Sequence, residues 1–350
     1  MRLLIVKLGA IGDIIHTLPA LSAIRRSFPD AEIGWIAEAR SAEILRGHQS
    51  INRLIEIDTR RWRNGMKAAD ALSEIKNELG DLRRHRFDKA IDFQGLIKSA
   101  AIAKASGARE RWGFSRNNLR EPASRILMNN AVEVPLKSNV IVKNLALAQG
   151  ALKFISGDPL EFGIKTSDKH KTEAVEIVSV IGANFALINP AGGWVTKLWN
   201  AEKYGALADR IYIEHGLPSV IVTGPAESEL AVRAMAASKT AKITAQQPTL
   251  KGFFELAKRT RIYIGGDTGP THLAIAAGAP VVGLFGPTEW WRNGSLNPLD
   301  VCVERLDIGC RIGCHRRECS NWICMDIEIE SVVEAISVRL EAGNRSPLKC

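Results

Sequence analysis

The sequence predicts an α/β protein with two similar domains, each built around a parallel sheet, whose loops face one central cleft. The chain has 350 residues, which exceeds one typical domain. In both halves, short apolar runs that favour strands alternate with amphipathic runs that favour helices. Many of the apolar runs end in a turn that contains glycine, as expected where buried strands pass into helices at the carboxyl edge of a parallel sheet.

The first of these crossovers is the most informative. The apolar run Leu3 to Val6 predicts a strand buried on both faces, and a helix is expected over 14–24. Gly9 and Gly12 allow the backbone between them to turn tightly and to approach a ligand. Asp13 is therefore expected at a helix N-terminus on the ligand-binding edge of the sheet. Asp13 is either a helix N-cap or a carboxylate that points into the cleft and acts as a general base. The turn does not contain the G-x-G-x-x-G motif of dinucleotide-binding proteins.

The same alternation continues along the chain. Further strands are expected at 33–37, 53–57, 87–92, 109–112, 185–189, 219–222, 261–265 and 280–285. Further helices are expected at 42–45, 66–82, 139–155, 171–181, 201–214, 250–259, from the turn at 266–272 through 277, and at 332–340. A polar linker at 156–159 divides the chain into domains 1–157 and 158–350, and the last helix either stays with the second domain or packs back on the first.

The composition narrows the class of protein. Hydrophobic residues make up 46% and charged residues 24%, which is ordinary for a globular domain. The net charge of +9 indicates an acidic partner: nucleic acid, an anionic membrane surface or an acidic substrate. Single-sign charge blocks are short, so nucleic acid is not expected. The sequence has no apolar run long enough to span a membrane and leads from Met1 directly into a strand, so a cytoplasmic protein is expected.

The basic side chains of the first half follow predicted strands. Arg60, Arg61 and Arg63 surround a tryptophan in a loop after 53–57, and arginine suits bidentate binding of carboxylate or phosphate. Gln94 and Lys98 lie in the glycine-bearing turn after 87–92, and Arg120 lies in a later polar loop. The alternatives are solvated loops and surface cations. Together these residues predict a site for an anionic acceptor.

The second half offers a phosphate-binding site. The turn Gly266 to His272 leads into a helix, and the backbone N–H groups of Thr268 and Gly269 are placed to bind a phosphate. Asp267 opposes simple phosphate binding unless it caps the helix or holds a ribose hydroxyl. His272 is either part of the site or a core histidine. Lys197, Glu227 and the small turn residues Gly192 and Gly193 complete the predicted donor site, Lys197 as a fixed cation and Glu227 as an acceptor for ribose hydroxyls.

At these residues the sequence resembles the bacterial heptosyltransferases of glycosyltransferase family 9. The segments that carry the resemblance are KLGAIGDIIHTLPAL, TRRWRNG, DFQGLIKSA, REPAS, TKLW and GGDTGPTHLAIAAGAPVVGLFGPT. The resemblance implies the GT-B fold, two Rossmann-like domains with parallel sheets facing a central cleft. It implies inverting transfer of L-glycero-D-manno-heptose from ADP-heptose to the Kdo of Kdo2-lipid A in lipopolysaccharide inner-core synthesis, without an essential metal. The enzyme would be peripheral on the inner leaflet of the inner membrane.

The resemblance also implies roles for the candidate residues. Asp13 would deprotonate the attacking Kdo hydroxyl, and Lys197 would neutralise the departing ADP. Asp267, Thr268 and His272 would lie at the donor sugar or its phosphates together with Gly269, and the basic residues of the first half would hold Kdo carboxylates and lipid A phosphates. The chain departs from the family where relatives carry hydroxyl residues before the lysine, because Gly192 and Gly193 stand there and only their backbone N–H groups could replace the hydroxyls.

Five of the six cysteines lie in one segment near the C-terminal end of the sequence. Cys310, Cys314, Cys319 and Cys324 are separated by three, four and four residues, with a histidine inside the segment. Such density in a cytosolic protein favours a structural metal over disulfides, but the spacing lacks C-x-x-C pairs. The alternative is a loop of reduced thiols packed against the last helix.

Three main functions stay open from the sequence, and a nucleotide-sugar epimerase is a fourth that fits less well, because its chemistry needs no acidic acceptor pocket. The first is a heptosyltransferase that acts on Kdo2-lipid A. The second is a family 9 glycosyltransferase with another acceptor, as in relatives that resemble heptosyltransferase II, or with another nucleotide sugar. The third is a nucleotide-sugar-binding protein without catalytic activity.

Overall fold

The structure is a computed structural model that describes residues 1–59, 80, 82–157, 159–311, 314 and 316–345. The chain divides into two compact units, unit 1 over Met1–Lys165 and unit 2 over Thr166–Cys350. The boundary between the units lies after Lys165, whereas the sequence placed the domain boundary after Gly157. The predicted helix at 66–82 and the arginines at 60, 61 and 63 lie outside the described residues, apart from residues 80 and 82.

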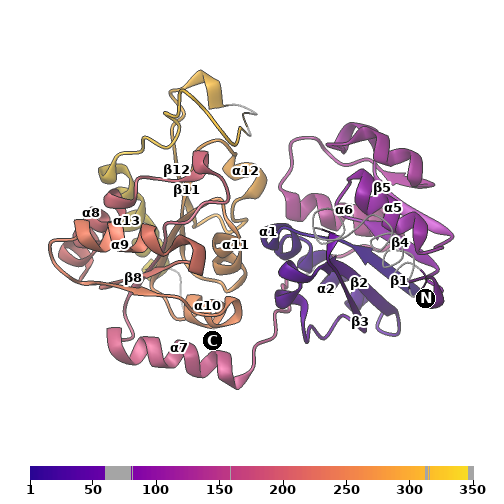
Figure 1. Ribbon diagram of the computed structural model, residues 1–350, viewed down its shortest axis with the longest axis horizontal. Helices are drawn as coiled ribbons and strands as arrows, with labels where there is room; N and C mark the ends of the chain where they lie inside the picture. Colours follow the sequence, from indigo (N-terminus) through magenta and orange to yellow (C-terminus); the bar gives the residue numbers. More distant parts are fainter. Residues whose placement is uncertain (60–79, 81, 158, 312–313, 315, 346–350) are drawn as a thin grey trace, which may run out of the picture. The chain divides into compact units, whose positions relative to one another are not determined.

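Unit 1 is organised around a central parallel sheet. In its described part, six strands pair in parallel in the order β3-β2-β1-β4-β5-β6. Figure 1 labels β1 to β5 of this sheet. The central strand β1 (Arg2–Val6) has no exposed side-chain surface from Leu3 onward, as its apolar run predicted. Val6 lies opposite Ile36 of β2 and Asp92 of β4. The residues that follow these three strands therefore leave the sheet at one edge.

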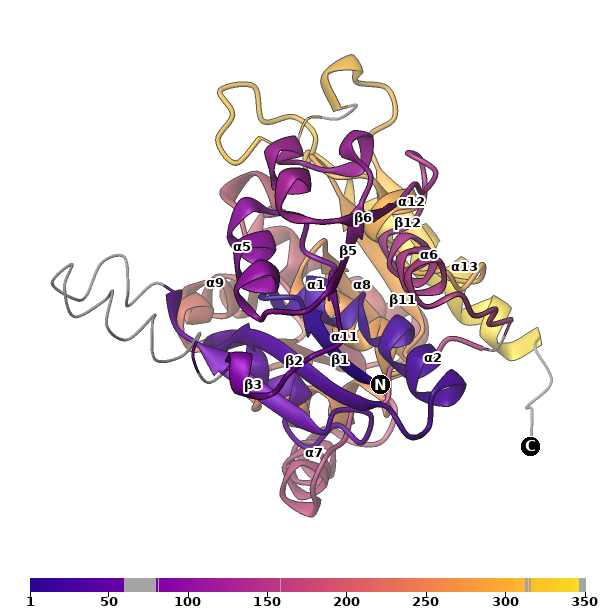
Figure 2. The ribbon, with the colours of Figure 1, turned by 90° about the vertical axis from the view of Figure 1, so that its right-hand side faces the viewer.

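The other elements of unit 1 follow in chain order. They are α1 (Ile11–Ile15), α2 (Leu18–Ser27), β2 (Glu32–Glu38), the 3-10 helix η1 (Ala39–Leu45), β3 (Arg53–Ile57), β4 (Lys89–Asp92), α5 (Ile97–Ala105), β5 (Glu110–Phe114), the 3-10 helices η2 (Arg116–Asn118) and η3 (Pro122–Leu127), β6 (Asn130–Val132) and α6 (Val140–Leu152). Figure 2 shows β1, β2 and β3 side by side, in agreement with their pairing.

The helix expected over 14–24 is in fact two helices. α1 ends at Ile15, and α2 begins at Leu18 with Pro19 in its first turn. Proline has no N–H to continue a preceding helix but fits the first turn of a new one. The buried side chain of Asn144 on α6 pairs with polar groups at the break between the two helices. Its Nδ2 donates to the backbone oxygen of His16 and to Oγ1 of Thr17, each at 3.0 Å.

Unit 2 repeats the topology of unit 1. Its described strands form a six-stranded parallel sheet in the order β12-β11-β10-β7-β8-β9. If the strands of unit 2 are numbered 1 to 6 from β7 to β12, their order read from β9 is 3-2-1-4-5-6. The strands of unit 1, numbered in the same way, have the same order. That order is the Rossmann arrangement, whose ligands bind where the strand order reverses, between the first and fourth strands. The predicted fold class is confirmed, and the topology points to β1/β4 and β7/β10.

The elements of unit 2 also follow in chain order. They are α7 (Asp168–Ile181), β7 (Ala186–Asn189), the 3-10 helix η4 (Val195–Lys197), α8 (Ala201–His215), β8 (Ser219–Val222), the 3-10 helix η5 (Pro225–Glu227), α9 (Ser228–Ala237), β9 (Ile243–Gln246), α10 (Leu250–Ala257), β10 (Ile262–Gly266), α11 (Gly269–Ala276), β11 (Val281–Phe285), α12 (Trp290–Asn293), β12 (Val301–Glu304), the 3-10 helix η6 (Gly309–Arg311) and α13 (Ile329–Arg345).

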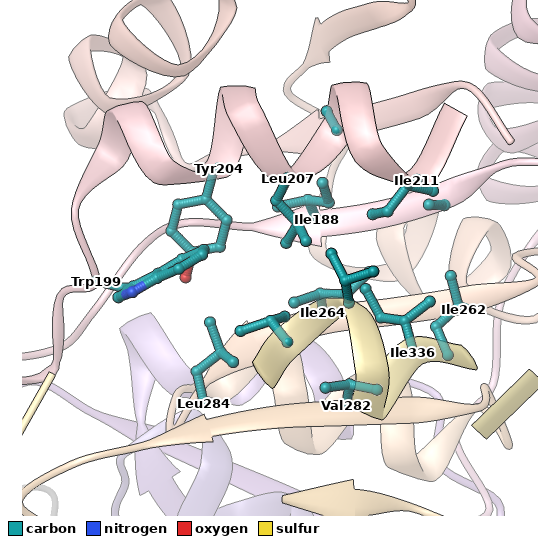
Figure 3. Packing of buried hydrophobic residues seen from close by; sticks show 14 of the residues in the cluster. Ile188, Trp199, Tyr204, Leu207, Ile211, Ile262, Ile264, Val282, Leu284 and Ile336 are labelled. Carbon is teal, nitrogen blue, oxygen red and sulfur yellow. The ribbon is translucent and has the colours of Figure 1, made fainter. Parts of the chain in front are cut away.

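The core of unit 2 includes the last helix. Figure 3 shows Ile336 of α13 among side chains of the sheet, including Ile262, Ile264 and Val282, with α8 contributing Leu207. All five side chains are fully buried. The apolar face of α13 therefore packs within its own unit. No helix in the described ranges is long and apolar enough to cross a membrane.

Candidate active site

Asp13 lies in the first turn of α1, just after the central strand of unit 1. The N-cap of this helix is Ala10, so the interpretation of Asp13 as the N-cap is wrong. Its side chain is half-buried, and its backbone oxygen accepts a hydrogen bond from Oγ1 of Thr17 at 2.9 Å. The carboxylate thus stands at the reversal point of the sheet, in a short helix that is anchored to the start of α2.

The loop that carries Asp13 is held by Gln94. Oε1 of Gln94 accepts hydrogen bonds from the backbone N–H groups of Leu8 (3.2 Å) and Gly9 (3.4 Å). A Cβ atom on Gly9 would lie 2.9 Å from Oγ of Ser41, so a larger residue here would require the Ser41 side chain to move. The structure therefore shows Gln94, predicted as an acceptor-binding residue, fixing the loop next to Asp13.

Two buried charged residues lie below that loop. Nζ of Lys7 donates to the backbone oxygen of Phe93 at 3.0 Å. Asp92 accepts from the backbone N–H groups of Gln94 (2.9 Å) and Gly95 (3.1 Å), and from Oγ of Ser99 (2.9 Å). Burial raises the pKa of Asp92 to about 6, although these hydrogen bonds act in the opposite direction. Asp92 thus shapes the turn between β4 and α5.

Lys98 belongs to a polar cluster that the sequence did not reveal in full. Its Nζ donates to Oε1 of Glu38 (2.9 Å) and to Oγ1 of Thr59 (2.8 Å), and Thr59 also donates to Glu38. The Glu38 side chain is 5% exposed and that of Lys98 is 49% exposed. Burial alone would raise the pKa of Glu38, but its bonds to Thr59 and Lys98 outweigh this and lower the pKa. The clue that reasoning from sequence missed was an acidic residue at the end of β2.

The structure does not bring Arg120 into this cluster. Arg120 is exposed in the loop before η3. Its neighbour Glu121 directs Oε2 to the backbone N–H of Ile97 at 2.8 Å. A carboxylate at the start of α5 is favourable, because it pairs with an N–H group that the helix leaves unsatisfied.

In unit 2, Lys197 and Asp267 form the centre of the site. Nζ of Lys197 lies 2.6 Å from Oδ2 of Asp267 and 3.0 Å from its backbone oxygen. The other carboxylate oxygen, Oδ1, lies 3.1 Å from Nε2 of His272, and Nδ2 of Asn293 donates to Oδ2 at 3.2 Å. Burial alone would raise the pKa of Asp267, but the bonds and charges of His272 and Lys197 outweigh it and hold this pKa well below its usual range.

This arrangement connects the turns after β7 and β10, at the point where the strand order reverses. Lys197 and Asp267 are 12% and 5% exposed, and His272 is buried beside them. Three predicted donor-site residues are therefore in direct contact, and Asn293, on α12, is a fourth member that the sequence analysis missed. Asp267 does not cap α11, because the N-cap is Thr268. The start of α11, with Gly269 as its first residue, retains the geometry that suits an anion.

The two glycines before Lys197 differ in how much space a side chain would have at each position. A Cβ atom on Gly192 would lie 2.9 Å from a methyl carbon of Leu198, whereas one on Gly193 would meet nothing within 4 Å. A side chain at position 192 would thus require Leu198 to shift and would crowd the backbone oxygen of Trp194, whereas position 193 is open. Glu227, predicted at the donor ribose, accepts a hydrogen bond from the backbone N–H of Gly224 at 3.2 Å and stabilises the turn after β8.

The cysteine-rich segment packs beside the same site. Cys310, Cys314, Cys319 and Cys324 are unbridged and line one small cavity, together with Thr196 and others. Among the described residues, no group of three or more His, Cys, Asp or Glu side chains is arranged to hold a metal ion. Burial, reinforced by the nearby thiol of Cys314, raises the pKa of Cys324. The four thiols therefore lie near one another around this cavity.

Comparison with known proteins defines the class. The model of glycosyltransferase family 9 (heptosyltransferase) matches residues 79–322. Lipopolysaccharide heptosyltransferase 1 of Pseudomonas aeruginosa is 30% identical over 290 residues, which cover 83% of this chain and 79% of that protein. The protein of the same name from Escherichia coli K12 is 27% identical over 297 residues, covering 83% and 89%.

A solved structure agrees in fold. E. coli heptosyltransferase WaaC with ADP-2-deoxy-2-fluoro heptose superposes with a TM-score of 0.76 at 22% identity, covering 98% of this chain and 100% of that chain. The two Rossmann-like units, with charged groups where each strand order reverses, are those of a GT-B glycosyltransferase. More particularly, the chain belongs to glycosyltransferase family 9, the heptosyltransferases.

Proposed function

We propose that this enzyme transfers L-glycero-D-manno-heptose from ADP-heptose to the Kdo of Kdo2-lipid A, in lipopolysaccharide inner-core synthesis. The observation that carries the proposal is the pair of sites at equivalent positions of two Rossmann-like units. One has a carboxylate, Asp13, in a helix at the reversal point, and the other has Lys197 beside the start of α11. A transferase needs such a division between an acceptor and a nucleotide-bound donor.

In the proposed reaction, Asp13 acts as the general base. Its carboxylate takes the proton of the Kdo hydroxyl while the hydroxyl oxygen forms a bond to the anomeric carbon of the heptose. The bond from that carbon to the ADP oxygen breaks, and the electron pair leaves with ADP, so the configuration inverts. Lys197 neutralises the charge that develops on the leaving diphosphate. General-base action contributes typically about 10²–10⁴-fold, and positioning of the two substrates supplies much of the remainder.

Unit 2 is proposed as the donor unit. The N-terminus of α11, with Thr268 and Gly269, suits a phosphate, since a helix N-terminus directs N–H groups and a partial positive charge at an anion. Lys197 and His272 lie beside that start, and Glu227 follows β8 at the same edge of the sheet. The fold neighbour in which an ADP-heptose analogue is bound supports a nucleotide sugar of this type.

Unit 1 is proposed as the acceptor unit. An ammonium group has three N–H donors, and Lys98 directs two of them to Glu38 and Thr59, so a third can donate to an acceptor carboxylate or phosphate. Arg120 and the three arginines at 60, 61 and 63 would add charge. Transfer further requires the two sites to face one cleft. A lipid-borne acceptor would bring the enzyme to the inner leaflet, where its net charge of +9 favours binding.

The alternative is another acceptor or another nucleotide sugar within family 9. The Pseudomonas and E. coli relatives favour the first heptose transfer, because both are heptosyltransferases 1. The test is a transfer assay with ADP-heptose and two purified acceptors, Kdo2-lipid A and the same lipid already carrying one heptose. Turnover confined to Kdo2-lipid A supports the proposal. Turnover confined to the heptosylated lipid contradicts it and assigns the second transfer.

No step of this reaction is assigned to a metal. The shared cavity of the four cysteines supports a structural metal there. Against it, the described residues contain no three ligands spaced to hold a metal ion. Elemental analysis of the purified enzyme tests it, with Cys302→Ser as the control because Cys302 is not among the residues that line the cavity. One equivalent of zinc or iron that is lost in Cys314→Ser would support the metal, and a metal-free active enzyme would remove it.

A further inference from the structure

The side chains at the donor site have little net positive charge to offer a diphosphate. The ammonium of Lys197 lies 2.6 Å from the carboxylate of Asp267, which largely compensates its charge. His272 directs its Nε2 to the same carboxylate, and Glu227 adds a negative charge at the neighbouring strand end. A nucleoside diphosphate carries more than one negative charge, and the N-terminus of α11 supplies only about half a positive charge. A further cation near Lys197 would therefore strengthen the binding of a diphosphate.

The cysteine-rich segment places a further cation, Arg317, near the donor site. The guanidinium carbon of Arg317 lies 5.4 Å from the centroid of the Trp194 ring, and Nζ of Lys197 lies 4.3 Å from the same centroid. Both are within the range of cation–π attraction. Trp194 thus acts as a platform that keeps two cations close to each other, although like charges repel. Such an arrangement is favourable when an anion binds to both.

The backbone beside Arg317 is fastened to the turn that carries Lys197. Oγ1 of Thr196 donates to the backbone oxygen of Arg316 at 2.6 Å, and Nε1 of Trp322 donates to the backbone oxygen of Thr196 at 3.0 Å. Thr196 is itself buried. These two hydrogen bonds anchor both ends of the segment 316–322 on one residue. The position of Arg317 beside Trp194 is therefore built into the fold.

We propose that Arg317 is a diphosphate-binding residue of the donor site, with Trp194 as its platform. The ligand is the diphosphate of a nucleoside diphosphate sugar, so the inference rests on the proposed function and adds a residue to it. Arginine suits this role because its guanidinium stays charged, binds two phosphate oxygens at once and stacks on an aromatic ring. Neither residue was among the predicted donor-site residues.

The test is calorimetric binding of ADP and of AMP to the full-length enzyme and to Arg317→Gln. Loss of charge-assisted hydrogen bonds should weaken ADP binding by about 10-fold or more and change AMP binding much less. Trp194→Leu should produce the same pattern, because it removes the platform. The control is Arg261→Gln, which removes an equal charge from an exposed residue next to the amino end of β10, at the opposite edge of the sheet.

Unchanged ADP binding in Arg317→Gln would overturn the inference. An equal loss of ADP and AMP binding would also overturn it, because that pattern indicates a displaced loop and not a lost phosphate contact. The test of Arg317 does not depend on which nucleotide the donor carries. If wild type binds UDP and UMP in place of the adenine nucleotides, the adenosine assignment fails, and the same comparison with the uridine pair tests Arg317.

Discussion

Lys197 and Asp267 form a buried ion pair, with Nζ of the lysine 2.6 Å from Oδ2 of the aspartate. The two residues follow β7 and β10, which are neighbours in the sheet. The pair therefore fixes the distance between two turns at the position where the Rossmann topology places a ligand. It also supplies a cation whose position is set before a substrate arrives.

The substitution Asp267→Asn tests this pair. It leaves the Lys197 ammonium buried without a compensating charge, and breaking such a pair typically costs about 3–5 kcal/mol of stability. Because the folded-state pKa of Asp267 is depressed, its contribution is present above the unfolded-state value of about 3.9 and is lost as the pH falls below it. Urea unfolding should therefore show the same loss at about pH 6 and pH 8, and a smaller one in acid.

The matched control is Asp307→Asn. Asp307 forms an ion pair with Arg305 but is 63% exposed, so its removal should change the unfolding midpoint little. An equal destabilisation by both substitutions would contradict the account of Asp267, since it would show that burial of the pair makes no difference.

Asp92 should give the stability of the folded protein the opposite pH dependence to that of Asp267. Its folded-state pKa of about 6 lies above the unfolded-state value, so the folded protein binds more protons between about pH 4 and pH 6. Its contribution to stability consequently falls as the pH rises through this window. Asp92→Asn mimics the protonated carboxyl and keeps the oxygen that accepts from Gln94 and Gly95. At about pH 8 it should be more stable than wild type by about 3 kcal/mol, since the pKa of Asp92 is raised to about 6 and each pKa unit corresponds to about 1.4 kcal/mol.

Urea unfolding of both proteins at about pH 4 and pH 8 measures this difference. The advantage of the Asn variant should be small at the lower pH, where wild-type Asp92 is protonated in the folded state. A variant that is less stable than wild type at the higher pH would show that the charged form of Asp92 stabilises the turn and would contradict the assigned pKa direction.

Lys98→Met tests the acceptor assignment. Loss of a charge-assisted hydrogen bond costs about 1.5–3 kcal/mol, so the KM for the acceptor should rise by about 10- to 100-fold. The KM for the nucleotide sugar should stay the same, because Lys98 belongs to unit 1. Steady-state kinetics with each substrate varied in turn measures both values.

Lys104→Met is the control for that experiment, since Lys104 is an exposed lysine on the same helix, α5. It should leave both KM values unchanged. A rise in both KM values for Lys98→Met would contradict a specific acceptor role and would point to a general disturbance of unit 1 through Glu38 and Thr59.

The fold was predictable from sequence because its signal is local. Apolar runs such as Leu3–Val6 and glycine-bearing turns such as 265–269 mark buried strands and the crossovers after them. Asp13, Lys197 and Asp267 were identified as candidates because each follows such a strand. Among the described strands at the sheet edges, β3 was predicted, but β6, β9 and β12 were not, since they are short and few of their side chains are fully buried.

The partners of these residues could not be predicted, because they come from distant parts of the chain. Glu38 meets Lys98 across 60 residues, and Asn293 meets Asp267 across 26. Arg317 lies near Trp194 in a segment whose two ends are bonded to Thr196. In each case the contact depends on strand order and loop path, which no local pattern records. The break between α1 and α2 was also missed, although Pro19 marks it.

The most direct test of the proposed function is turnover of ADP-heptose with Kdo2-lipid A by wild type and by Asp13→Asn. The substitution keeps the size of the side chain and removes the proton-accepting carboxylate. We predict turnover by wild type and a loss of kcat of at least about 10²-fold in the variant, with ADP binding unchanged. Undiminished turnover in Asp13→Asn would contradict the assignment of Asp13 as the general base.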